Sequence, residues 1–451
     1  MSDVATLIDA LIAIVGQPFV RTTPQADIYR LDERVPWVVV SPGTVEEVAA
    51  VLALAHGAEL AVVPWGGGTT MGLGQPLERM DIVLCLHRLN HILEHEPAEL
   101  TATVQAGITI AVLQNQLGSR GQWWPVDPPL PESATLGGVL ATNASGPKRL
   151  LYGTARDLVI GVQVVHADGV SSKAGGKVAK NVTGYDMMKL YIGSLGTLAV
   201  IVGATLKLRP LPPVQQLVWA GFPTPVAAWQ AAQPLLRSQL LPNAIELVNP
   251  TVAAFLQRNV AGPDSGQGWG LLVGFDGVEP AVARQIRELQ GMCQAAGMTA
   301  WWTDLDDGRL WRALQARFRP QGTERDERLV LRVATVRTEV LPWLDGLARD
   351  EVCGGEGLEL AARLGNGLIF ANLPYPHDRA GTERLMERMT EMRAQLMARR
   401  GYLVIESAPV SFKAQFDSWG DLGPQAEVMS ALKREFDPRR VLTPGRLFNG
   451  L

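Results

Sequence analysis

The chain has 451 residues, of which 47% are hydrophobic and 19% are charged, and its formal net charge at pH 7 is −4. This length predicts two or three domains, because single hydrophobic cores stop growing at roughly 250 to 300 residues. The small negative charge gives no reason to expect a nucleic acid as partner. The three cysteines (Cys85, Cys293 and Cys353) lie far apart, which argues against a disulfide framework and against an iron–sulfur cluster.

Neither a membrane span nor a signal peptide is expected from the sequence. No apolar run approaches the roughly 18 residues that a membrane-spanning helix needs. The N-terminal stretch "MSDVATLIDALIAIVG" has acidic residues where a secretory signal would carry basic ones, and it predicts a short amphipathic helix. We therefore expect a cytoplasmic protein, which could still lie at the inner membrane through its partners.

The first half of the chain is rich in predicted strands. Residues 37–40 form the first of them, and the helix predicted over 45–57 has Thr44 as its N-cap, Glu47 at the third helical position and Gly57 at its end. Further strands are predicted over 60–65, 81–86, 101–107, 158–172 and 197–208. A proline-rich boundary follows near residue 212.

A second unit begins near residue 215, where strands and helices alternate. Strands are predicted over 216–222, 244–249, 268–277, 299–305 and 329–335, and the longest helices over 279–297 and 379–400. This alternation predicts an α+β unit in which helices cover a sheet. The ending "ALKREFDPRRVLTPGRLF" predicts a helix, a stop at a proline and a short return segment.

The stretch "AVVPWGGGTTMGLGQPLERMDIVLCL" (61–86) places five glycines between two apolar runs. Glycine loses more conformational entropy on folding than any other residue. It is therefore useful in such a loop only where the chain turns sharply or where a ligand comes very close to the main chain. The usual ligand of this kind is a phosphate group.

Two common phosphate-binding loops do not fit this stretch. A Walker A loop needs a Lys after its glycines, and residues 64–81 contain none. A dinucleotide fingerprint needs a third glycine where Met71 stands, and residues 69–80 are too few for a crossover helix. A phosphate would therefore have to be held by consecutive loop amides, with the hydroxyl groups of Thr69 and Thr70 as further donors. The alternative is a plain glycine-rich hairpin.

Two later segments carry a similar signal. Residues 127–161 are rich in Gly, Ser, Thr and Asn, and residues 193–197 form a second glycine turn before an apolar strand. In this order and spacing, "VVPWGGGTTMGLG", "PESATLGGVLATNASG" and "GSLGTLAVI" resemble the FAD-binding domain of flavoproteins of the vanillyl-alcohol oxidase / p-cresol methylhydroxylase type, over about residues 30–212. Within that family, "GGKVAKNVTGYDMMKL" and the ending "EFDPRRVLTPGRLF" look most like the smaller FAD-binding subunit of bacterial glycolate oxidase.

The resemblance implies an α+β fold with a p-cresol methylhydroxylase-type FAD-binding domain, made of two α/β subdomains, and a cap domain whose sheet is covered by helices. It also implies how the chain is divided. A helical segment over 1–30 precedes the FAD-binding domain over 31–212. A cap for substrate or partner follows over 213–410, and a C-terminal segment over 411–451 returns to the FAD-binding domain.

Position within these motifs implies which residues contact FAD. Those near the pyrophosphate are Pro64, Trp65, Gly66, Gly67, Gly68, Thr69 and Thr70; those near the ribityl chain and flavin ring are Ser133, Thr135, Gly137, Gly138, Thr142 and Ser145; those near the adenine portion are Gly196 and Ile201. Many relatives attach FAD covalently through a His in or beside the first loop. Residues 57–86 contain no His, so we expect non-covalent FAD.

The second unit departs from the larger, catalytic type of subunit, which is akin to D-lactate dehydrogenases. That type carries a "GHxGDGNxH"-like segment thought to hold a metal, and the comparable residues 361–374 contain no His. We therefore predict no metal site. The resemblance implies an FAD-binding oxidoreductase acting on CH–OH groups, a subunit of a glycolate-oxidase-like complex that passes electrons from a small 2-hydroxy acid to flavin or iron–sulfur partner subunits. The alternatives are a self-sufficient FAD-dependent 2-hydroxy-acid dehydrogenase and a non-redox nucleotide-binding scaffold.

Oxidation of an acid of this kind needs a base for the hydroxyl proton and usually an Arg for the carboxylate. Arg332 and Arg363 lie on predicted strands and are weak candidates for the second role, although pairing with a carboxylate is the more common reason for an Arg on a strand. His377, in "LPYPHDRAG", is a weak candidate base, and a loop residue without such a role is the alternative. The sequence shows no strong base, so we assign no catalytic residue from it.

Overall fold

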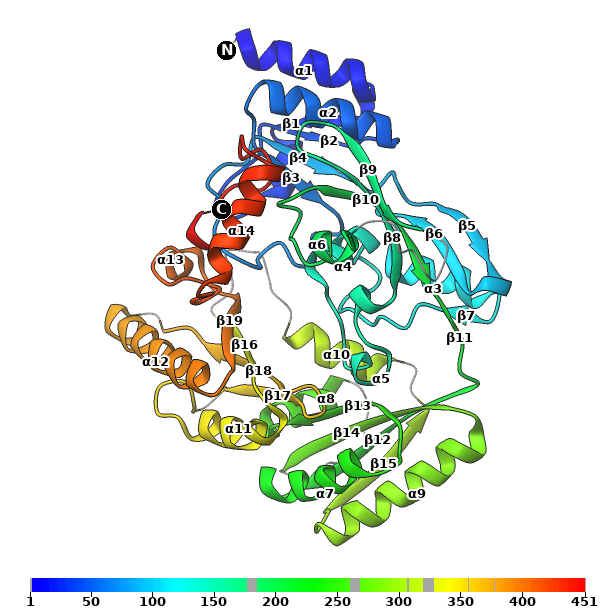
Figure 1. Ribbon diagram of the computed structural model, residues 1–451. Coiled ribbons are helices and arrows are strands. Elements are labelled where there is room, and N and C mark those ends of the chain that lie inside the picture. Colours follow the sequence, from blue (N-terminus) through cyan, green and yellow to red (C-terminus); the bar gives the residue numbers. More distant parts are fainter. Residues whose placement is uncertain are drawn as a thin grey trace.

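The computed structural model describes residues 2–176, 185–259, 268–305, 308–318, 328–355, 357–376 and 378–450. It combines helices with three larger sheets (Figure 1). Two of these sheets use strands from the first half of the chain, and the third uses strands from residues 214 to 407. The predicted α+β class is therefore confirmed. Within the described part of the chain, no helix has the length and apolar character needed to cross a membrane.

The first sheet has four strands in the order β1-β2-β4-β3. Its strands are β1 (Val20–Thr22), β2 (Val38–Val40), β3 (Val62–Trp65) and β4 (Ile82–Cys85), and α1 (Ser2–Val15) and α2 (Val45–Gly57) pack on it. The Thr44 side chain accepts a hydrogen bond from the Glu47 N–H, as predicted for the start of α2. β3 and β4 run parallel, which rules out a hairpin for the glycine loop between them.

The second sheet is antiparallel and has five strands in the order β5-β6-β10-β8-β9. Its strands are β5 (Ile92–Glu96), β6 (Thr101–Gln105), β8 (Val159–Val165), β9 (Ser171–Gly175) and β10 (Val200–Lys207). The nearby helices are α3 (Ile110–Gly118), α4 (Leu136–Thr142), α5 (Arg149–Tyr152) and α6 (Met188–Tyr191), and a small ladder joins β7 (Gln122–Trp123) to β11 (Arg209–Pro210).

The third sheet is antiparallel, with eight strands in the order β15-β12-β14-β13-β17-β18-β16-β19. These are β12 (Val214–Phe222), β13 (Pro242–Val248), β14 (Trp269–Gly277), β15 (Ala300–Leu305), β16 (Arg328–Ala334), β17 (Glu359–Arg363), β18 (Leu368–Pro374) and β19 (Tyr402–Ser407). The helices that accompany it are α7 (Pro225–Arg237), α8 (Pro250–Asn259), α9 (Glu279–Ala295), α10 (Arg309–Arg317), α11 (Val340–Arg349) and α12 (Arg379–Ala398).

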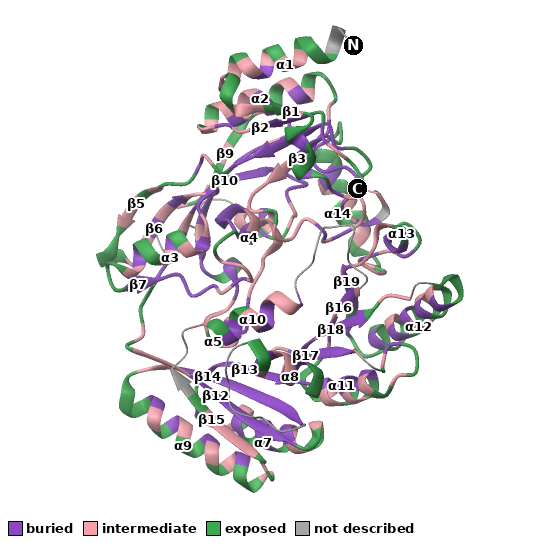
Figure 2. Ribbon diagram, turned by 180° about the vertical axis from the view of Figure 1, so that it is seen from behind, coloured by how far each residue is buried: buried purple, intermediate pink, exposed green. Residues whose placement is uncertain are grey.

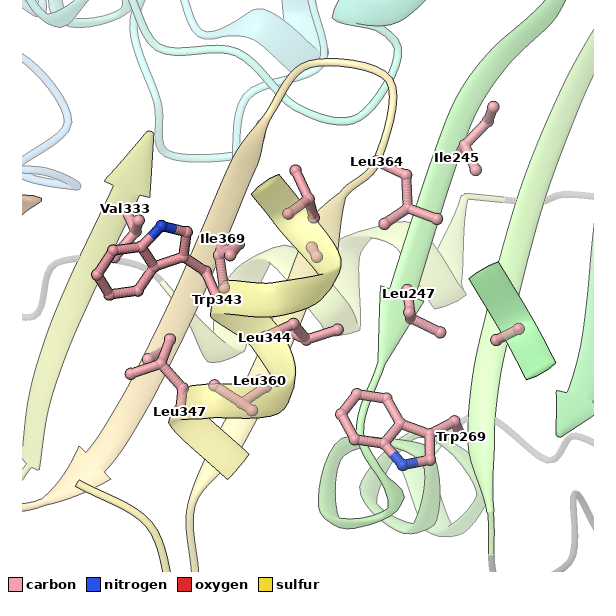
Figure 3. Close-up of a cluster of buried hydrophobic side chains, with 14 of the residues drawn as sticks. Ile245, Leu247, Trp269, Val333, Trp343, Leu344, Leu347, Leu360, Leu364 and Ile369 are labelled. Atoms are coloured by element: carbon pink, nitrogen blue, oxygen red, sulfur yellow. The ribbon is translucent and has the colours of Figure 1, made fainter. Parts of the chain in front are cut away.

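Side-chain alternation sends the two faces of this large sheet into different cores. On β12, Val218 belongs to the core under α7, α9, α11 and α12, whereas Trp219 belongs to a smaller core with α8 and α10. Figure 3 shows part of the larger core, where Trp343 and Leu344 of α11 lie over the sheet. The outer sides of α9 and α12 are exposed, while the strands beneath them are largely buried (Figure 2). α5 and α10 lie between this sheet and the five-stranded sheet (Figure 1).

The C-terminal segment contains α13 (Val410–Lys413) and α14 (Gln425–Phe436) and packs on the first half of the chain. The main chain at Val62 of β3 donates a hydrogen bond to the Val441 carbonyl, and its own carbonyl accepts one from the Thr443 N–H. The Lys433 ammonium, which is 1% exposed, donates to the carbonyls of Thr197 and Leu442 and pairs with Asp437. The last 20 residues thereby hold two distant segments of the first half together.

Candidate functional site

A cleft opens where the glycine loop, α4, the turn before β10 and the C-terminal segment meet. Every residue predicted to contact FAD lines this cleft except Ser133 and Ser145. The structure therefore brings together three segments that the sequence only suggested to be related. Their individual roles toward FAD remain predictions.

The glycine loop lies directly against the chain at residues 133–135. A Cβ atom on Gly67 would stand 1.7 Å from the Ser133 carbonyl oxygen, and one on Gly66 would stand 2.2 Å from the Thr135 hydroxyl oxygen. No side chain fits in either place. Ser133 does not line the cleft, and its carbonyl contacts the loop on the side away from the cleft.

The turn before β10 forms another part of the cleft wall and is held by α4. The N–H groups of Gly193 and Leu195 donate to the carbonyls of Leu140 and Ala141 at 2.9 and 2.8 Å. Gly196 has a φ of +71°, a left-handed conformation that glycine adopts without strain. The turn is therefore fixed before any ligand binds.

The residues of the cleft fit a dinucleotide such as FAD. Among the described residues, none accepts a hydrogen bond from the main-chain N–H groups of residues 67–70. Four consecutive amides that the protein does not use are the donors expected for a pyrophosphate group held without a helix end. These loop residues would hold the pyrophosphate of FAD.

Two residues of the C-terminal segment, Thr443 and Arg446, also line the cleft, and sequence reasoning missed both. Arg446 is 4% exposed; its guanidinium donates to the Gln75 carbonyl at 2.8 Å and lies 3.0 Å from the Asp32 carboxylate. It is the one charged side chain among the described residues that line the cleft. Since only the folded chain places residue 446 beside residue 66, no local pattern could have indicated it.

A second cavity adjoins the cleft, and Thr70, Leu73, Thr142 and Leu195 border both. One wall is the segment from residue 142 to 149, and the other is the face of the large sheet that also carries α10. Three arginines and two glutamates line it, namely Arg149, Arg332, Arg363, Glu246 and Glu406. Apolar side chains such as Leu314 and Phe370 make up much of the remaining wall.

Both arginines proposed from the sequence face this cavity, and both are paired. Arg332 donates a hydrogen bond to Glu406 on the neighbouring strand. Arg363 lies 3.1 Å from Glu246 and also donates to the Ser145 carbonyl at 2.9 Å. Each has the carboxylate partner that an Arg on a strand usually has, so neither guanidinium is free of a countercharge. Ser145, predicted to lie near the flavin, lines this second cavity.

Arg149 of α5 is the cation that sequence reasoning missed. Its guanidinium donates to the Ser145 hydroxyl at 3.2 Å, and no carboxylate of the described chain forms an ion pair with it. Burial lowers the pKa of Arg149, and the nearby charges of Arg363 and Arg332 lower it further. Such an unpaired, partly buried cation in a cavity is stabilised when an anion binds.

Two further predictions from the sequence concern His377 and metal binding. His377 lies outside the described residues. Within the part of the chain that the structure describes, no group of three or more His, Cys, Asp or Glu side chains is placed to hold a metal ion.

Replacing Gly67 should abolish retention of FAD. In Gly67→Ala the new methyl group would overlap the Ser133 carbonyl and displace the loop, which should lower the flavin content of the purified protein about tenfold or more. The ratio of flavin to protein absorbance measures this. Gly118→Ala is the matched control, because nothing lies within 4 Å of a Cβ at that helical position. Full yellow occupancy in Gly67→Ala would contradict the role of the loop.

Acid denaturation should release all of the flavin. The resemblance implies that covalent attachment would use a His, and the described residues that line the cleft include none. After acid precipitation, flavin absorbance should be in the supernatant and none in the washed pellet. Flavin that stays with the pellet would contradict the prediction of non-covalent binding.

Comparisons with known proteins agree with this geometry. The chain is 26% identical to "Glycolate oxidase subunit GlcD" of Bacillus subtilis, over 92% of this chain and 90% of that protein. It is 28% identical to a D-lactate dehydrogenase of Archaeoglobus fulgidus, over 96% and 98%. It is 27% identical to a D-2-hydroxyglutarate dehydrogenase of Xanthomonas citri, over 92% and 89%.

Solved structures show the same fold. p-Cresol methylhydroxylase with substrate bound superposes with a TM-score of 0.76 at 18% identity, covering 99% of this chain and 97% of that chain. Alkyldihydroxyacetonephosphate synthase superposes with a TM-score of 0.71 at 20% identity, covering 98% and 86%. The predicted p-cresol methylhydroxylase-type fold is thereby confirmed.

Two family models match the chain in sequence order. The model described as "FAD binding domain" matches residues 36–175, which include the glycine loop and α4, and the model described as "FAD linked oxidases, C-terminal domain" matches residues 211–338, which include most strands of the large sheet. With the cleft and its unused loop amides, these matches identify the bound group as FAD. The chain thus carries matches to the FAD-binding domain and to the C-terminal domain of FAD-linked oxidases, and it is an FAD-dependent oxidoreductase.

Proposed function

We propose that the chain oxidises a small 2-hydroxy acid, as the FAD-binding subunit of a glycolate-oxidase-like complex. The observation that carries this proposal is the position of Arg149, an arginine without a carboxylate partner, in a cavity that adjoins the FAD cleft. The names of the relatives support it, since glycolate, D-lactate and D-2-hydroxyglutarate are all 2-hydroxy acids.

The charges of the second cavity favour an anionic substrate. Three arginines and two glutamates leave a formal excess of one positive charge on its walls. The carboxylate of a small acid would balance that charge. Guanidinium groups bind carboxylates through paired, charge-assisted hydrogen bonds, so Arg149 is the group that would hold the substrate.

The walls also explain how the acid would be oriented. When bound, FAD supplies the acceptor for two electrons and for the hydrogen that leaves the substrate carbon. Arg363 and Arg332 are held by their glutamate partners and form part of the cavity wall. Arg149 would therefore be the arginine that binds the carboxylate of the acid. The apolar side chains of Leu314, Phe318 and Phe370 exclude water from the rest of the space. An exclusion of water strengthens the hold on the carboxylate.

We infer that electrons then leave to partner subunits, because a complex of this kind couples a flavin subunit to further redox centres. A cytoplasmic location, with contact to the inner membrane through partners, fits this proposal. A self-sufficient 2-hydroxy-acid dehydrogenase is the second candidate function, favoured by the relatives named D-lactate and D-2-hydroxyglutarate dehydrogenase, which the chain matches over nearly its whole length.

Assay of the purified chain tests the proposal and separates these two candidates. Glycolate and D-lactate should reduce the bound flavin, which bleaches its visible absorbance under anaerobic conditions. As a subunit, the lone chain should show slow steady-state turnover with an artificial dye and faster turnover with its co-purified partners. Fast turnover of the lone chain would favour the self-sufficient enzyme. Failure of every 2-hydroxy acid to reduce the flavin would contradict the proposed substrate class.

Replacing Arg149 should weaken substrate binding more than it slows the reaction. Arg149→Gln removes the charge that meets the carboxylate, which should raise KM for glycolate or D-lactate roughly 10- to 100-fold and change kcat much less. Steady-state kinetics with the complete enzyme measures the split. Arg156→Gln, an exposed arginine seven residues away, is the matched control and should behave like wild type. An unchanged KM in Arg149→Gln would remove Arg149 from the carboxylate site.

A further inference from the structure

Glu246 is a buried carboxylate on the wall of the second cavity. Its neighbours on β13, Ile245 and Leu247, point into the large core (Figure 3), so alternation turns Glu246 to the opposite face, where the cavity lies. Glu246 is 2% exposed. Burial of a carboxylate costs free energy, so a buried carboxylate usually has a charged partner or a function.

Glu246 is paired with Arg363, but one of the two carboxylate oxygens of Glu246 accepts no hydrogen bond. Oε1 of Glu246 lies 3.1 Å from Nε of Arg363, but the two atoms do not align into a hydrogen bond. Among the described residues nothing else bonds to that oxygen. Arg363 is meanwhile held elsewhere, by its hydrogen bond to the Ser145 carbonyl. Oε1 is therefore a buried oxygen without a hydrogen bond, and the carboxylate of Glu246 can still take a proton.

Burial raises the pKa of Asp127 to about 6, but the other carboxylates nearby differ from Glu246 in their contacts or in their place. Asp127 accepts hydrogen bonds from the N–H groups of Gly146 and Lys148 at 3.0 and 3.1 Å, and it is not among the residues that line the cavity. Glu406 faces the cavity, but its carboxylate accepts the hydrogen bond of Arg332. Of the three acids, Glu246 alone combines a place on the cavity wall with an unsatisfied oxygen.

The surroundings of Glu246 adjust its protonation. Burial raises the pKa of Glu246 to about 7; the charge of Asp127, from the segment before α4, raises it as well, and Arg363, from β17, opposes the rise. A third charged group, Arg149, lines the same cavity from α5, the helix that packs against β13. A general base works best when its pKa lies near the operating pH.

We propose that Glu246 is the catalytic base, which accepts the hydroxyl proton of an acid whose carboxylate is held by Arg149. This inference rests on the proposed function. The O–H bond of the substrate breaks and its proton goes to the carboxylate of Glu246. The C–H hydrogen leaves with two electrons to oxidised FAD, and a C=O bond forms, so the product is a 2-oxo acid.

Proton uptake on product binding tests this assignment without turnover. The oxygen of a bound 2-oxo acid should accept a hydrogen bond from protonated Glu246. At a pH about one unit above the pKa of about 7, binding of glyoxylate should therefore draw up to one proton per site from the buffer. Calorimetry of the FAD-bound protein in two buffers of different ionisation enthalpy measures this uptake. Glu246→Gln should bind glyoxylate without taking up a proton, and Glu246→Asp should restore the proton uptake.

Flavin reduction by glycolate gives a second, kinetic readout. A base acts in its ionised form, so the rate in wild type should rise as the pH rises through the pKa of Glu246. Glu246→Gln should lower this rate roughly 100- to 10,000-fold and lose the rise. Glu359→Gln is the matched control. Glu359 lies on β17 of the same sheet, is as buried as Glu246 and pairs with Arg317 of α10, but it does not line the cavity. Its proton uptake and pH profile should stay those of wild type.

The outcomes separate this inference from the proposed function. If Glu246→Gln still takes up the proton and keeps the pH dependence, Glu246 is not the base, whatever the substrate. If no 2-hydroxy acid reduces the flavin of the wild-type protein and no 2-oxo acid binds to it, the proposed function is wrong. The proposed role of Glu246 is then wrong as well. Retained flavin and an unchanged melting temperature show that a variant is folded.

Discussion

The direct contact between the main chain at Gly67 and the Ser133 carbonyl determines the shape of the FAD cleft. Because no side chain stands between the two segments, the loop is placed by backbone atoms whose positions do not vary with rotamers. The same stretch continues into α4, and α4 holds the turn at Gly193 and Leu195. Three separate segments thus form one rigid surface, and a dinucleotide would meet amides already in position. Preorganisation of this kind lowers the ordering cost of binding.

The second cavity depends on Arg363, which connects the two halves of the molecule. Its guanidinium contacts Glu246 on the large sheet and the Ser145 carbonyl on the opposite wall. A buried ion pair of this kind adds little net stability compared with apolar packing. This sheet face could have been filled with leucine and valine, as the other face is, where Leu329, Leu331 and Val333 of β16 lie in the large core. That polar groups stand at this place instead indicates a function for the cavity.

The sequence predicted what depends on local pattern. The strands over 60–65 and 81–86, the cap of α2 at Thr44 and the loop between β3 and β4 all follow from spacing and residue type, and the structure contains each of them. Residue spacing also predicted that the loop could hold a phosphate without a helix end. These properties are set by residues within about 20 positions of one another, and a single sequence displays them openly.

The proposed base and the proposed carboxylate-binding residue could not be found in this way. Glu246 looks like any strand residue until its neighbours show that it is buried beside a cavity, and Arg149 looks like a surface residue of a short helix. Both gain their character from contacts between residues more than 90 positions apart. Arg332 and Arg363 were visible as strand arginines, but only the structure shows that glutamates already neutralise them. Arg446 lies 380 residues from Gly66, although both line one cleft.

The composition of the second cavity bears on whether the chain is a subunit or an enzyme by itself. The lack of histidines in residues 361–374 argued from sequence for a chain that depends on its partners. A carboxylate grip at Arg149 and a proton acceptor at Glu246 would provide both substrate-binding and proton-transfer groups within this one chain, using a guanidinium and a carboxylate instead of imidazoles. Chemistry at the substrate would then need no residue from another subunit. The dependence on partners would concern only the electrons, which must leave the reduced flavin before a second substrate can react.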